Sequence, residues 1–292
     1  MDLMGYTTDS RTAILAHRPA AIQAGFLGYA GTIGADYIDY LMADQILIPE
    51  SSQPYYTEKI VYLPDTYMPN DSKRAISNRA FGRAEFGLPQ AGFVFCSFNN
   101  SYKINPGVFD RWMRILKKVA GSVLWLSEYN ATAVAKLKKE AGIRGINPDR
   151  LVFAPRMPSL ADHLARQRLA DLFLDTLPYN AHTSASDALW AGLPVLTQIG
   201  ETFAGRVAAS LLTAIGLPEL ITATPQAYEE LAIELAADPA KLAAIKRKLE
   251  DNRLTTPLFD TKLFTKHIEA AYAAMYARHQ AELPPDHIYV PR

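Results

Sequence analysis

The sequence has almost no cysteine: Cys96 is the only one in 292 residues. An intrachain disulfide therefore cannot form, and a zinc site built on several cysteines is excluded. Cys96 lies within the apolar run FVFCSF, which indicates a buried thiol with a packing role rather than a reactive one.

Net charge and long hydrophobic runs are missing as well. Thirty basic residues balance thirty acidic ones, so the chain lacks the broad positive potential that is typical of nucleic-acid-binding proteins. No apolar run approaches the roughly 18–20 residues that span a bilayer, and the first residues, MDLMGYTTDSR, do not resemble a signal peptide. Hydrophobic residues make up 49% and charged residues 21%, as in globular proteins. We therefore expect a cytoplasmic protein with no nucleic-acid or membrane partner.

Short apolar runs alternate with helical patterns from about residue 93. The runs predicted as strands are FVFCSF, SVLWL, LVFAP, LADLFLD and LPVLT. Between the first two, GVFDRWMRILKKVAG places its apolar residues on one helical face. Short buried strands that alternate with helices favour an α/β fold with a parallel sheet covered on both faces. The sequence predicts a Rossmann-like lobe, whose ligands bind where strands end and helices begin.

The rest of the chain divides around this lobe. Residues 1–70 read as the incomplete tail of an N-terminal lobe, including the strand-like IVYLPDTYMP, and 71–92 as a linker with little periodicity. The Rossmann-like lobe spans 93–260, and 261–292 form a long helix and a tail that we expect to pack back across the domain boundary. Asp238 and Asp260 occupy good N-cap positions of helices.

The stretch PYNAHTSASDALWAGLPVLT places a polar run between a strand and a helix that begins at about Thr183. A helix start offers free N–H groups and the positive end of the helix dipole, which suits phosphate. Thr183 and Ser184 add hydroxyl groups there, His182 adds an imidazole, and Asp187 is placed to accept hydrogen bonds from a ribose. The alternative is ordinary capping of the helix by Asn180 or Thr183, with Asp187 stabilised by the dipole.

Four further candidates are basic residues. Lys103 follows the strand FVFCSF, where a lysine either offsets the charge of a diphosphate or is simply solvated. His163 and Arg166 are spaced i, i+3 on one helical face, although Arg166 is also explained as a surface ion-pair partner. Arg206, in GETFAGRVAAS, reads as a structural cation rather than a ligand contact.

Several of these segments together resemble a known family. HTSASDALWAGLPVLT followed by GETFAGRVAASLL resembles the O-linked N-acetylglucosamine transferase and SPINDLY family. The likeness extends to HRPAAIQAGFLGYAGTIGADYIDYLMAD, YTEKIVYLPDTY and FNNSYKI, and to the closing PDH, so it covers essentially the whole chain. It implies a GT-B type, inverting, metal-independent glycosyltransferase without a cofactor. Such an enzyme transfers N-acetylglucosamine from UDP-GlcNAc to Ser or Thr hydroxyls of protein acceptors.

The resemblance also implies a role for each candidate residue. Lys103 matches the lysine that contacts the diphosphate and is essential for transfer. The residues expected near the phosphates are Asn100, His182, Thr183 and Ser184. Those expected around the uridine are Met157, His163, Arg166 and, at the ribose, Asp187. The loop from Gly28 to Gly31 is expected to approach the sugar, since its glycines permit tight turns; a plain surface turn is the alternative.

Two other functions stay open. A SPINDLY-like protein O-fucosyltransferase would use GDP-fucose with the same helix-start motif. A truncated nucleotide-binding module without activity is the other possibility, because the family's N-terminal lobe and tetratricopeptide array are expected upstream of MDLMGYTTDS.

Overall fold

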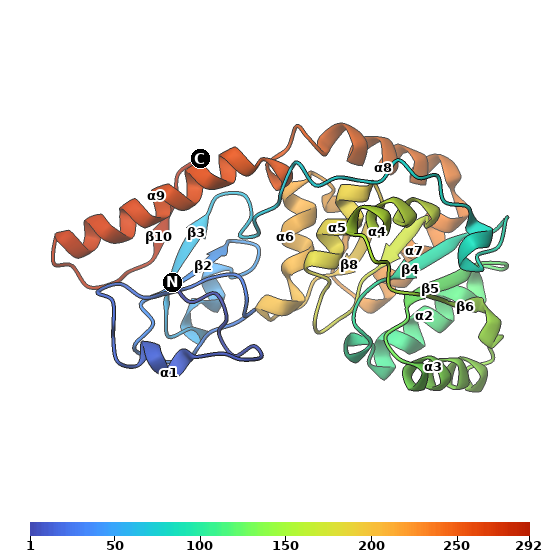
Figure 1. Cartoon of the computed structure of the whole chain (residues 1–292), viewed down its shortest axis with the longest axis horizontal. Coiled ribbons are helices and arrows are strands. Elements are labelled where there is room, and N and C mark those ends of the chain that lie inside the picture. The colour runs from blue at the N-terminus through green and yellow to red at the C-terminus, as the bar shows by residue number, and fades with distance from the viewer.

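The computed structural model describes all 292 residues, which form two lobes, each built on a parallel sheet (Figure 1). The first lobe contains the four-stranded sheet of β1 (Ala24–Gly25), β2 (Tyr40–Asp44), β3 (Lys59–Leu63) and β10 (Ile288–Tyr289). The second lobe contains the six-stranded sheet of β4 (Val94–Ser97), β5 (Val123–Ser127), β6 (Leu151–Ala154), β7 (Leu172–Leu174), β8 (Val195–Gln198) and β9 (Ile221–Thr222).

The strands of the second lobe run in the order β6-β5-β4-β7-β8-β9, and every pair is parallel. All five strands predicted from the apolar runs are present, and the α/β class is confirmed. The chain winds outward from β4 to one edge of the sheet and then from β7 to the other. The order therefore reverses between β4 and β7, and the carboxyl ends of these two neighbours form the crevice in which open α/β sheets bind ligands.

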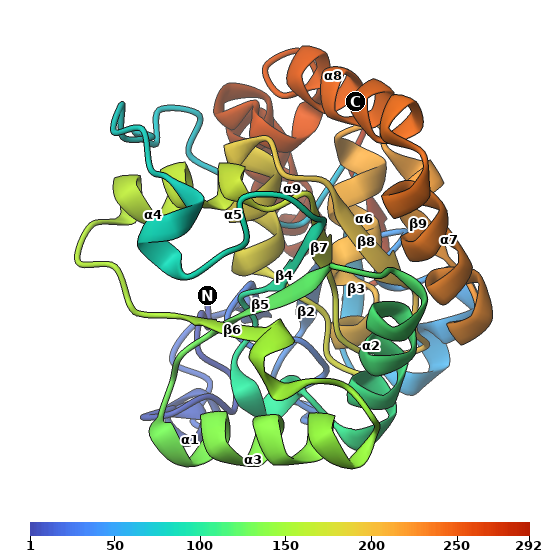
Figure 2. The same ribbon diagram turned by 90° about the vertical axis from the view of Figure 1, so that its right-hand side faces the viewer.

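Helices cover both faces of this sheet (Figure 2). One face carries α2 (Pro106–Lys118), α3 (Ala131–Ile143) and α7 (Pro225–Ala237). The other carries α4 (Leu160–Arg166), α5 (Thr183–Ala191) and α6 (Val207–Ala214). Helix α2 buries Val108, Trp112, Ile115 and Leu116, as its sequence pattern predicted.

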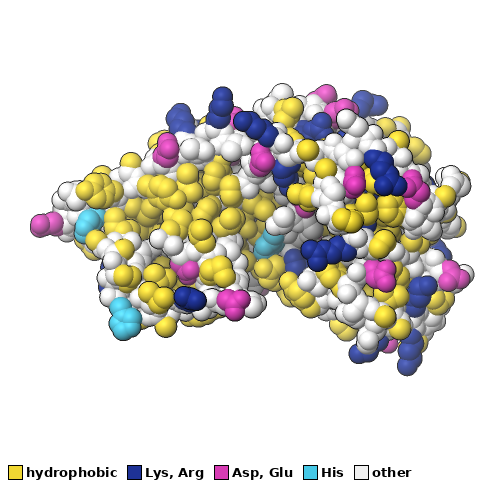
Figure 3. Space-filling view, in the orientation of Figure 1, with side chains coloured by type: hydrophobic (Ala, Val, Ile, Leu, Met, Phe, Trp, Pro, Cys, Tyr) yellow, Lys and Arg dark blue, Asp and Glu magenta, His cyan; other side chains and the backbone are white.

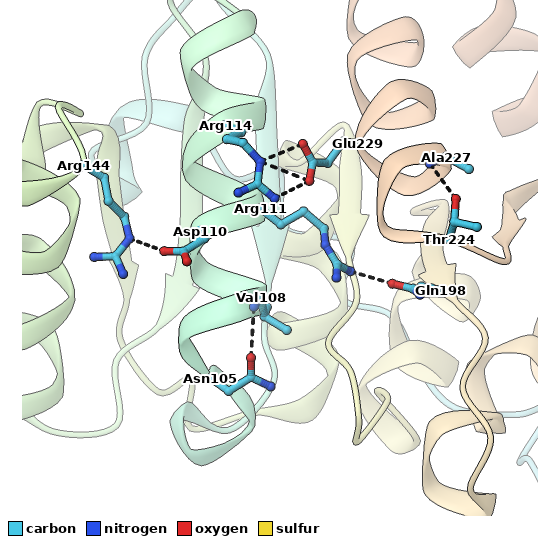
Figure 4. A network of polar contacts seen from close by, with 10 residues as sticks. All are labelled: Asn105, Val108, Asp110, Arg111, Arg114, Arg144, Gln198, Thr224, Ala227 and Glu229. Atoms are coloured by element: carbon cyan, nitrogen blue, oxygen red, sulfur yellow. Dashed lines mark hydrogen bonds and ion pairs between the residues drawn. The ribbon is translucent and has the colours of Figure 1, made fainter.

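Polar contacts fasten α2 to its neighbours (Figure 4). Arg114 binds the carboxylate of Glu229 on α7, with Nε 2.9 Å from Oε2, and Arg111 donates to Gln198 Oε1 of β8 over 2.8 Å. Asn105 caps the start of α2, because its side-chain oxygen accepts from the backbone N–H of Val108. Exposed ion pairs of this kind add little stability each, so the buried apolar face of α2 holds it in place.

The chain returns to the first lobe at its end. Helix α8 (Pro239–Asn252) covers the second lobe, and α9 (Thr261–Gln280) then crosses to the first lobe and packs on β3 and β10. The two caps expected from sequence are present: Asp238 accepts from the N–H of Lys241, and Asp260 accepts from that of Leu263, each over 2.9 Å. The first lobe is thus completed by the most distant part of the chain.

Short helical turns make up the remaining regular structure. They are α1 (Thr12–Leu15), η1 (Glu50–Tyr55), η2 (Arg83–Phe86), η3 (Ser101–Lys103), η4 (Pro148–Arg150), η5 (Gln167–Leu169), η6 (Phe203–Gly205), η7 (Pro218–Leu220) and η8 (Pro257–Phe259).

One buried and one half-buried ionisable side chain join the lobes. Asp44, at the end of β2, accepts hydrogen bonds from Ser210 Oγ of α6 (2.6 Å) and from the N–H of Tyr67 (3.0 Å). Arg206 donates to the carbonyls of Ile46 in the first lobe and Gly200 in the second. These two contacts support the structural interpretation of Arg206, which also lines a cleft between the lobes.

The two lobes have different surfaces. Hydrophobic side chains gather on the first lobe around α9 (Figure 3), where Met1, Tyr272 and Tyr276 are exposed. Cys96 is buried in β4, and burial raises the pKa of its thiol, which fits the inert thiol expected from sequence. None of the helices combines the length and the apolar character needed to cross a membrane.

Candidate functional site

Lys103 lies at the end of β4, beside the loop that follows β7. Its Nζ donates a hydrogen bond to the carbonyl of Asn180 over 2.8 Å and stands 4.3 Å from the centre of the Tyr179 ring. Burial lowers the pKa of Lys103 to about 8, and the carboxylate of Asp175 partly opposes this shift. Lys103 is therefore not a solvated loop lysine but a partly desolvated cation held in the crevice between β4 and β7.

Helix α5 begins at Thr183, as predicted, and its first turn is not capped by a side chain. The N-cap residue is His182, whose carbonyl accepts from the N–H groups of Ala185 and Ser186. The N–H groups of Thr183 and Ser184 have no acceptor within the chain. Capping by Asn180 or Thr183 is therefore wrong, since the amide of Asn180 donates to the carbonyl of Thr176 instead. An uncapped helix start of this kind is suited to an anion.

His182 contributes a neutral ring at the same point. The ring stacks on Tyr179 with 4.7 Å between centres, and Nε2 lies 3.2 Å from the carbonyl of Ala204. A carbonyl only accepts, so Nε2 carries the hydrogen and Nδ1 is left as an acceptor. Burial, and then the charge of Lys103, lowers the pKa of His182 to about 4. The positive charge at the helix start therefore comes from Lys103 and the helix dipole.

A buried polar network fixes the loop between β7 and α5. Asp175 accepts from the N–H groups of Thr176 (2.7 Å) and Ala181 (2.6 Å), and burial raises its pKa to about 6. Asn99 donates to Thr176 Oγ1 over 2.9 Å and accepts from Ser184 Oγ over 2.8 Å. Ser184 is thereby anchored to the end of β4. The predicted phosphate-site residue Asn100 is half-buried beside it and starts the short turn that carries Lys103.

A cleft of about 670 Å³ opens beside the start of α5, a volume within the usual range for small-molecule sites. It brings together six residues that the sequence singled out: Met157, His163, Arg166, Thr183, Ser184 and Asp187. Phe98, Tyr129 and Leu160 supply apolar surface to the same cleft. Lys103, Asn100 and His182 lie outside its lining, around the helix start, and Gly28 lies in the other lobe.

Arg166 is buried in the wall of this cleft without a carboxylate partner. Its guanidinium lies 5.3 Å from the ring centre of Phe98, and it donates to the carbonyl of Pro155 (2.5 Å) and to Nδ1 of His163 (2.9 Å). The alternative of a surface ion pair is therefore wrong. Burial lowers the pKa of Arg166 to about 10 and that of His163 to about 4, so His163 is neutral. A buried guanidinium without an acid suits a ligand that carries oxygen acceptors.

Asp187 also lines the cleft, and its carboxylate forms an ion pair with Arg74. Both side chains are largely buried, with exposed fractions of 11% and 15%. Burial raises the pKa of Asp187, and the Arg74 guanidinium opposes that rise. Arg74 comes from the segment predicted as a linker, 113 residues away in sequence, so local sequence gave no signal for the pair.

Gly28 is required by a backbone contact. A Cβ at this position would lie 1.9 Å from the carbonyl oxygen of Leu3, so only glycine fits. Its expected contact with the sugar stays a prediction. The following residues, Tyr29, Gly31 and Thr32, line a second cleft of about 790 Å³ between the lobes.

Glu58 anchors this loop of the first lobe from within. The carboxylate, 1% exposed, accepts hydrogen bonds from the N–H of Ile33 over 2.6 Å and from Thr32 Oγ1 over 2.5 Å. The sequence interpretation did not select Glu58, nor Asp175 or Tyr179. Asp175 could have been found from the sequence, because it ends the apolar run LADLFLD at the end of a strand. Glu58, just before the strand IVYL, gave a weaker indication.

The comparison with known proteins identifies one family for this chain. The family model described as glycosyl transferase family 41 matches residues 1–81 and 77–268. The chain is 39% identical over 99% of its length to a protein of Arabidopsis thaliana named probable UDP-N-acetylglucosamine--peptide N-acetylglucosaminyltransferase SEC. It is 31% identical over 96% of its length to a protein of Petunia hybrida with the corresponding name SPINDLY. In each case it spans 30% of the relative's own length.

Solved structures give the same result for the fold. A mutant of the O-GlcNAc transferase of Thermobaculum terrenum superposes with a TM-score of 0.80 and 32% identity, covering 90% of this chain and 49% of that one. Sucrose-phosphate synthase of Thermosynechococcus elongatus shares the fold at 15% identity, with a TM-score of 0.58 over 82% of this chain and 59% of that one. The GT-B type fold expected from sequence is confirmed.

Proposed function

This chain belongs to glycosyl transferase family 41, and from that premise we propose that it transfers N-acetylglucosamine from UDP-GlcNAc to Ser or Thr hydroxyls of proteins. The observation that carries the proposal is the uncapped start of α5, with two N–H groups free. Lys103 lies beside this start, and a cleft of nucleotide size adjoins it. The names of the relatives at 39% and 31% identity support the same donor and the same class of acceptor.

In this proposal the diphosphate of the donor binds at the helix start. The N–H groups of Thr183 and Ser184 and the hydroxyl of Thr183 donate to its oxygens, and the ammonium of Lys103 offsets its charge. That charge grows as the bond from the anomeric carbon to the diphosphate breaks, so preorganised donors stabilise the transition state more than the ground state. Lys103 is thus the catalytic residue of the proposal.

The uridine occupies the cleft beside α5. Phe98 and Met157 provide apolar contact for the base, and Arg166 lies in the wall beside them. Neutral His163 is oriented by the hydrogen bond from Arg166 to its Nδ1, and its Nε2 lies 3.3 Å from Nε2 of Gln167. Asp187 accepts from the ribose. Asn100 contributes at the phosphates from the turn that carries Lys103.

The acceptor hydroxyl approaches from the side of the first lobe. The second cleft is lined by residues of both lobes, among them Phe203, which precedes Ala204, the hydrogen-bond partner of His182. Tyr55, with 80% of its surface exposed, stands at this cleft, and an exposed aromatic ring is suited to contact with an extended peptide. The loop of Gly28 to Gly31 lies between the two reactants in this arrangement.

Calorimetry with UDP and with GDP tests the donor assignment. We expect saturable binding of UDP and binding of GDP at least about tenfold weaker, because the proposal assigns a uridine donor to this cleft. A preference for GDP would replace the donor by a guanosine diphosphate sugar. Absence of any saturable binding to the well-folded chain would overturn the proposal.

Transfer is tested separately with radiolabelled UDP-GlcNAc and a peptide rich in serine and threonine. We expect label in the peptide that rises linearly with time and with the concentration of this chain. Binding of UDP without any transfer would leave a nucleotide-binding module and contradict the enzymatic part of the proposal.

A further inference from the structure

We propose that Arg74, on the segment that joins the two lobes, is a positioning residue that orients the carboxylate of Asp187 toward the ribose of the donor. The inference rests on the proposed function, since it assigns a partner to the residue at the ribose. Arg74 touches neither the phosphates nor the base in this assignment, and it acts through Asp187.

Arg74 makes four contacts with helix α5. Its Nη1 pairs with Asp187 Oδ1, its Nη2 donates to Ser186 Oγ over 3.3 Å, and its guanidinium lies 5.7 Å from the ring centre of Trp190. The backbone carbonyl of Arg74 accepts from Nε1 of Trp190 over 3.1 Å. Asp187, Ser186 and Trp190 all belong to α5. The segment that joins the lobes therefore packs against α5, the helix whose start is the proposed diphosphate site.

The segment is itself held at Asn70, which precedes this contact. Asn70 Oδ1 accepts from Ser186 Oγ, and Asn70 Nδ2 donates to the carbonyl of Leu258 over 3.1 Å. Thr261, the first residue of α9, donates through Oγ1 to the carbonyl of Asn70 over 2.9 Å. Arg74 thus reaches α5 from a backbone that is held by both the second lobe and the helix returning to the first.

The ion pair leaves half of the carboxylate available. Arg74 occupies Oδ1 of Asp187, whereas Oδ2 has no hydrogen-bond partner in the chain and is not among the buried unpaired atoms. An ionised carboxylate is purely an acceptor, so the accessible oxygen suits the hydroxyl groups of a ribose. A fixed guanidinium on the other oxygen limits rotation of the carboxylate, which lowers the entropy cost of binding.

The charge of Arg74 also favours the ionised form of this acceptor. Burial raises the pKa of Asp187, and Arg74 is the group that lowers it. Arg166 and Arg156 line the same cleft, together with His163 and Glu128. A protonated carboxyl would offer a donor where the hydroxyls of the ribose need an acceptor.

The experiment compares UDP with its 2′,3′-dideoxy analogue, which lacks both ribose hydroxyls, by calorimetry on the whole chain. We expect the native protein to prefer UDP by about tenfold, the usual order for hydrogen bonds to a charged group. In Arg74→Met the affinity for UDP should fall about tenfold while that for the analogue changes less than about twofold, so the preference disappears. Arg74→Lys, which keeps the charge but not the planar fork, should restore part of the preference.

Arg253→Met is the matched control. The guanidinium of Arg253 lies 5.6 Å from the ring centre of Trp190, which Arg74 also contacts, and it donates to the carbonyl of Trp190 over 3.0 Å. Arg253 does not contact Asp187. We expect this variant to keep the native preference for UDP over the analogue.

Three results would overturn the inference. The first is an unchanged preference for UDP over the analogue in Arg74→Met. The second is an equal loss of affinity for both ligands in that variant. The third is loss of the preference in Arg253→Met as well. If a thermal melt shows that Arg74→Met is unfolded, the ratio of the affinities for UDP and for the analogue is measured in Arg74→Lys instead. A ratio equal to that of the native protein would then count against the inference. Failure of the proposed function looks different, because the native protein itself would then not bind UDP.

Discussion

The two lobes carry different kinds of structure. The second lobe has six parallel strands with helices on both faces. The first has four strands, of which β1 and β10 contain two residues each, and it depends on α9 to cover its sheet. The second lobe therefore has the larger sheet, with a core that can hold buried polar groups in fixed positions, whereas the first lobe has a smaller sheet that the returning helix α9 covers.

The same difference applies to the functional groups. The second lobe holds the uncapped helix start, Lys103, Asp175 and Arg166 at the reversal of its strand order. The first lobe contributes a loop anchored by Glu58 and borders the second cleft. We infer that donor binding resides in the second lobe and that the first lobe contributes to alignment for transfer. Three experiments test this division, beginning with the largest effect.

Lys103→Ala should abolish most transfer without unfolding the chain. The variant removes the ammonium beside the helix start, and loss of one preorganised group of this kind slows a reaction by about 10²–10³-fold. UDP affinity should fall less, by about tenfold, because the helix start remains. Transfer assays and calorimetry on the same preparation measure the two effects. The matched control is Lys117→Ala, which alters an exposed lysine at the end of α2 and should keep the native rate. A native rate in Lys103→Ala would show that its role is misassigned.

Glu58→Gln tests the first lobe. The amide keeps one acceptor oxygen and places its N–H groups at the position of the other, so one of the two donors, Ile33 N–H or Thr32 Oγ1, loses the charged acceptor that it now has. The loop should therefore be held less firmly in position. Transfer should fall about tenfold, the order of one lost buried hydrogen bond, while the dissociation constant of UDP stays within about twofold. Glu269→Gln, an exposed change on α9 in the same lobe, serves as the control. A parallel loss of UDP affinity in Glu58→Gln would contradict the division between the lobes.

The pH dependence of UDP binding gives the smallest effect. Since the pKa of Lys103 is lowered to about 8, the free protein loses this cation as the pH rises through that value. The phosphates of UDP, with a second pKa near 6, are about nine-tenths ionised at pH 7 and change little above it. Affinity should therefore fall about fivefold between pH 7 and 8.7. Calorimetry at both pH values should show no such fall in Lys103→Met. An equal fall in that variant would assign the pH dependence to another group.

Local patterns were sufficient for most of the second lobe. Strands β4 to β8 were predicted because each is a short apolar run between polar segments, and a fully buried parallel strand needs no other signal. Strand β2 was missed, since YLMAD follows a segment rich in glycine and tyrosine without clear alternation. Strand β10 has two residues, and its pairing with β3 defines it. No local pattern contains that information, because the partner lies more than two hundred residues earlier.

The candidate site divides in the same way. Its residue types and the start of α5 at Thr183 were predicted, but the absence of a side-chain cap was not, because Asn180 turns back to Thr176. The sequence spacing of Arg166 fitted a surface ion pair as well as a ligand contact. Its burial beside the ring of Phe98 excludes the surface ion pair.

By itself, the sequence determined the alternation of strands and helices, the point at which α5 begins, and the family. These properties depend on neighbours a few residues apart, where backbone geometry and hydrophobic periodicity act directly. Only the tertiary structure decided which charges meet: Arg74 with Asp187, Lys103 with the carbonyl of Asn180, and Arg206 with both lobes. Such pairs depend on the path of the whole chain, and burial then sets the strength of each interaction and the protonation of each group.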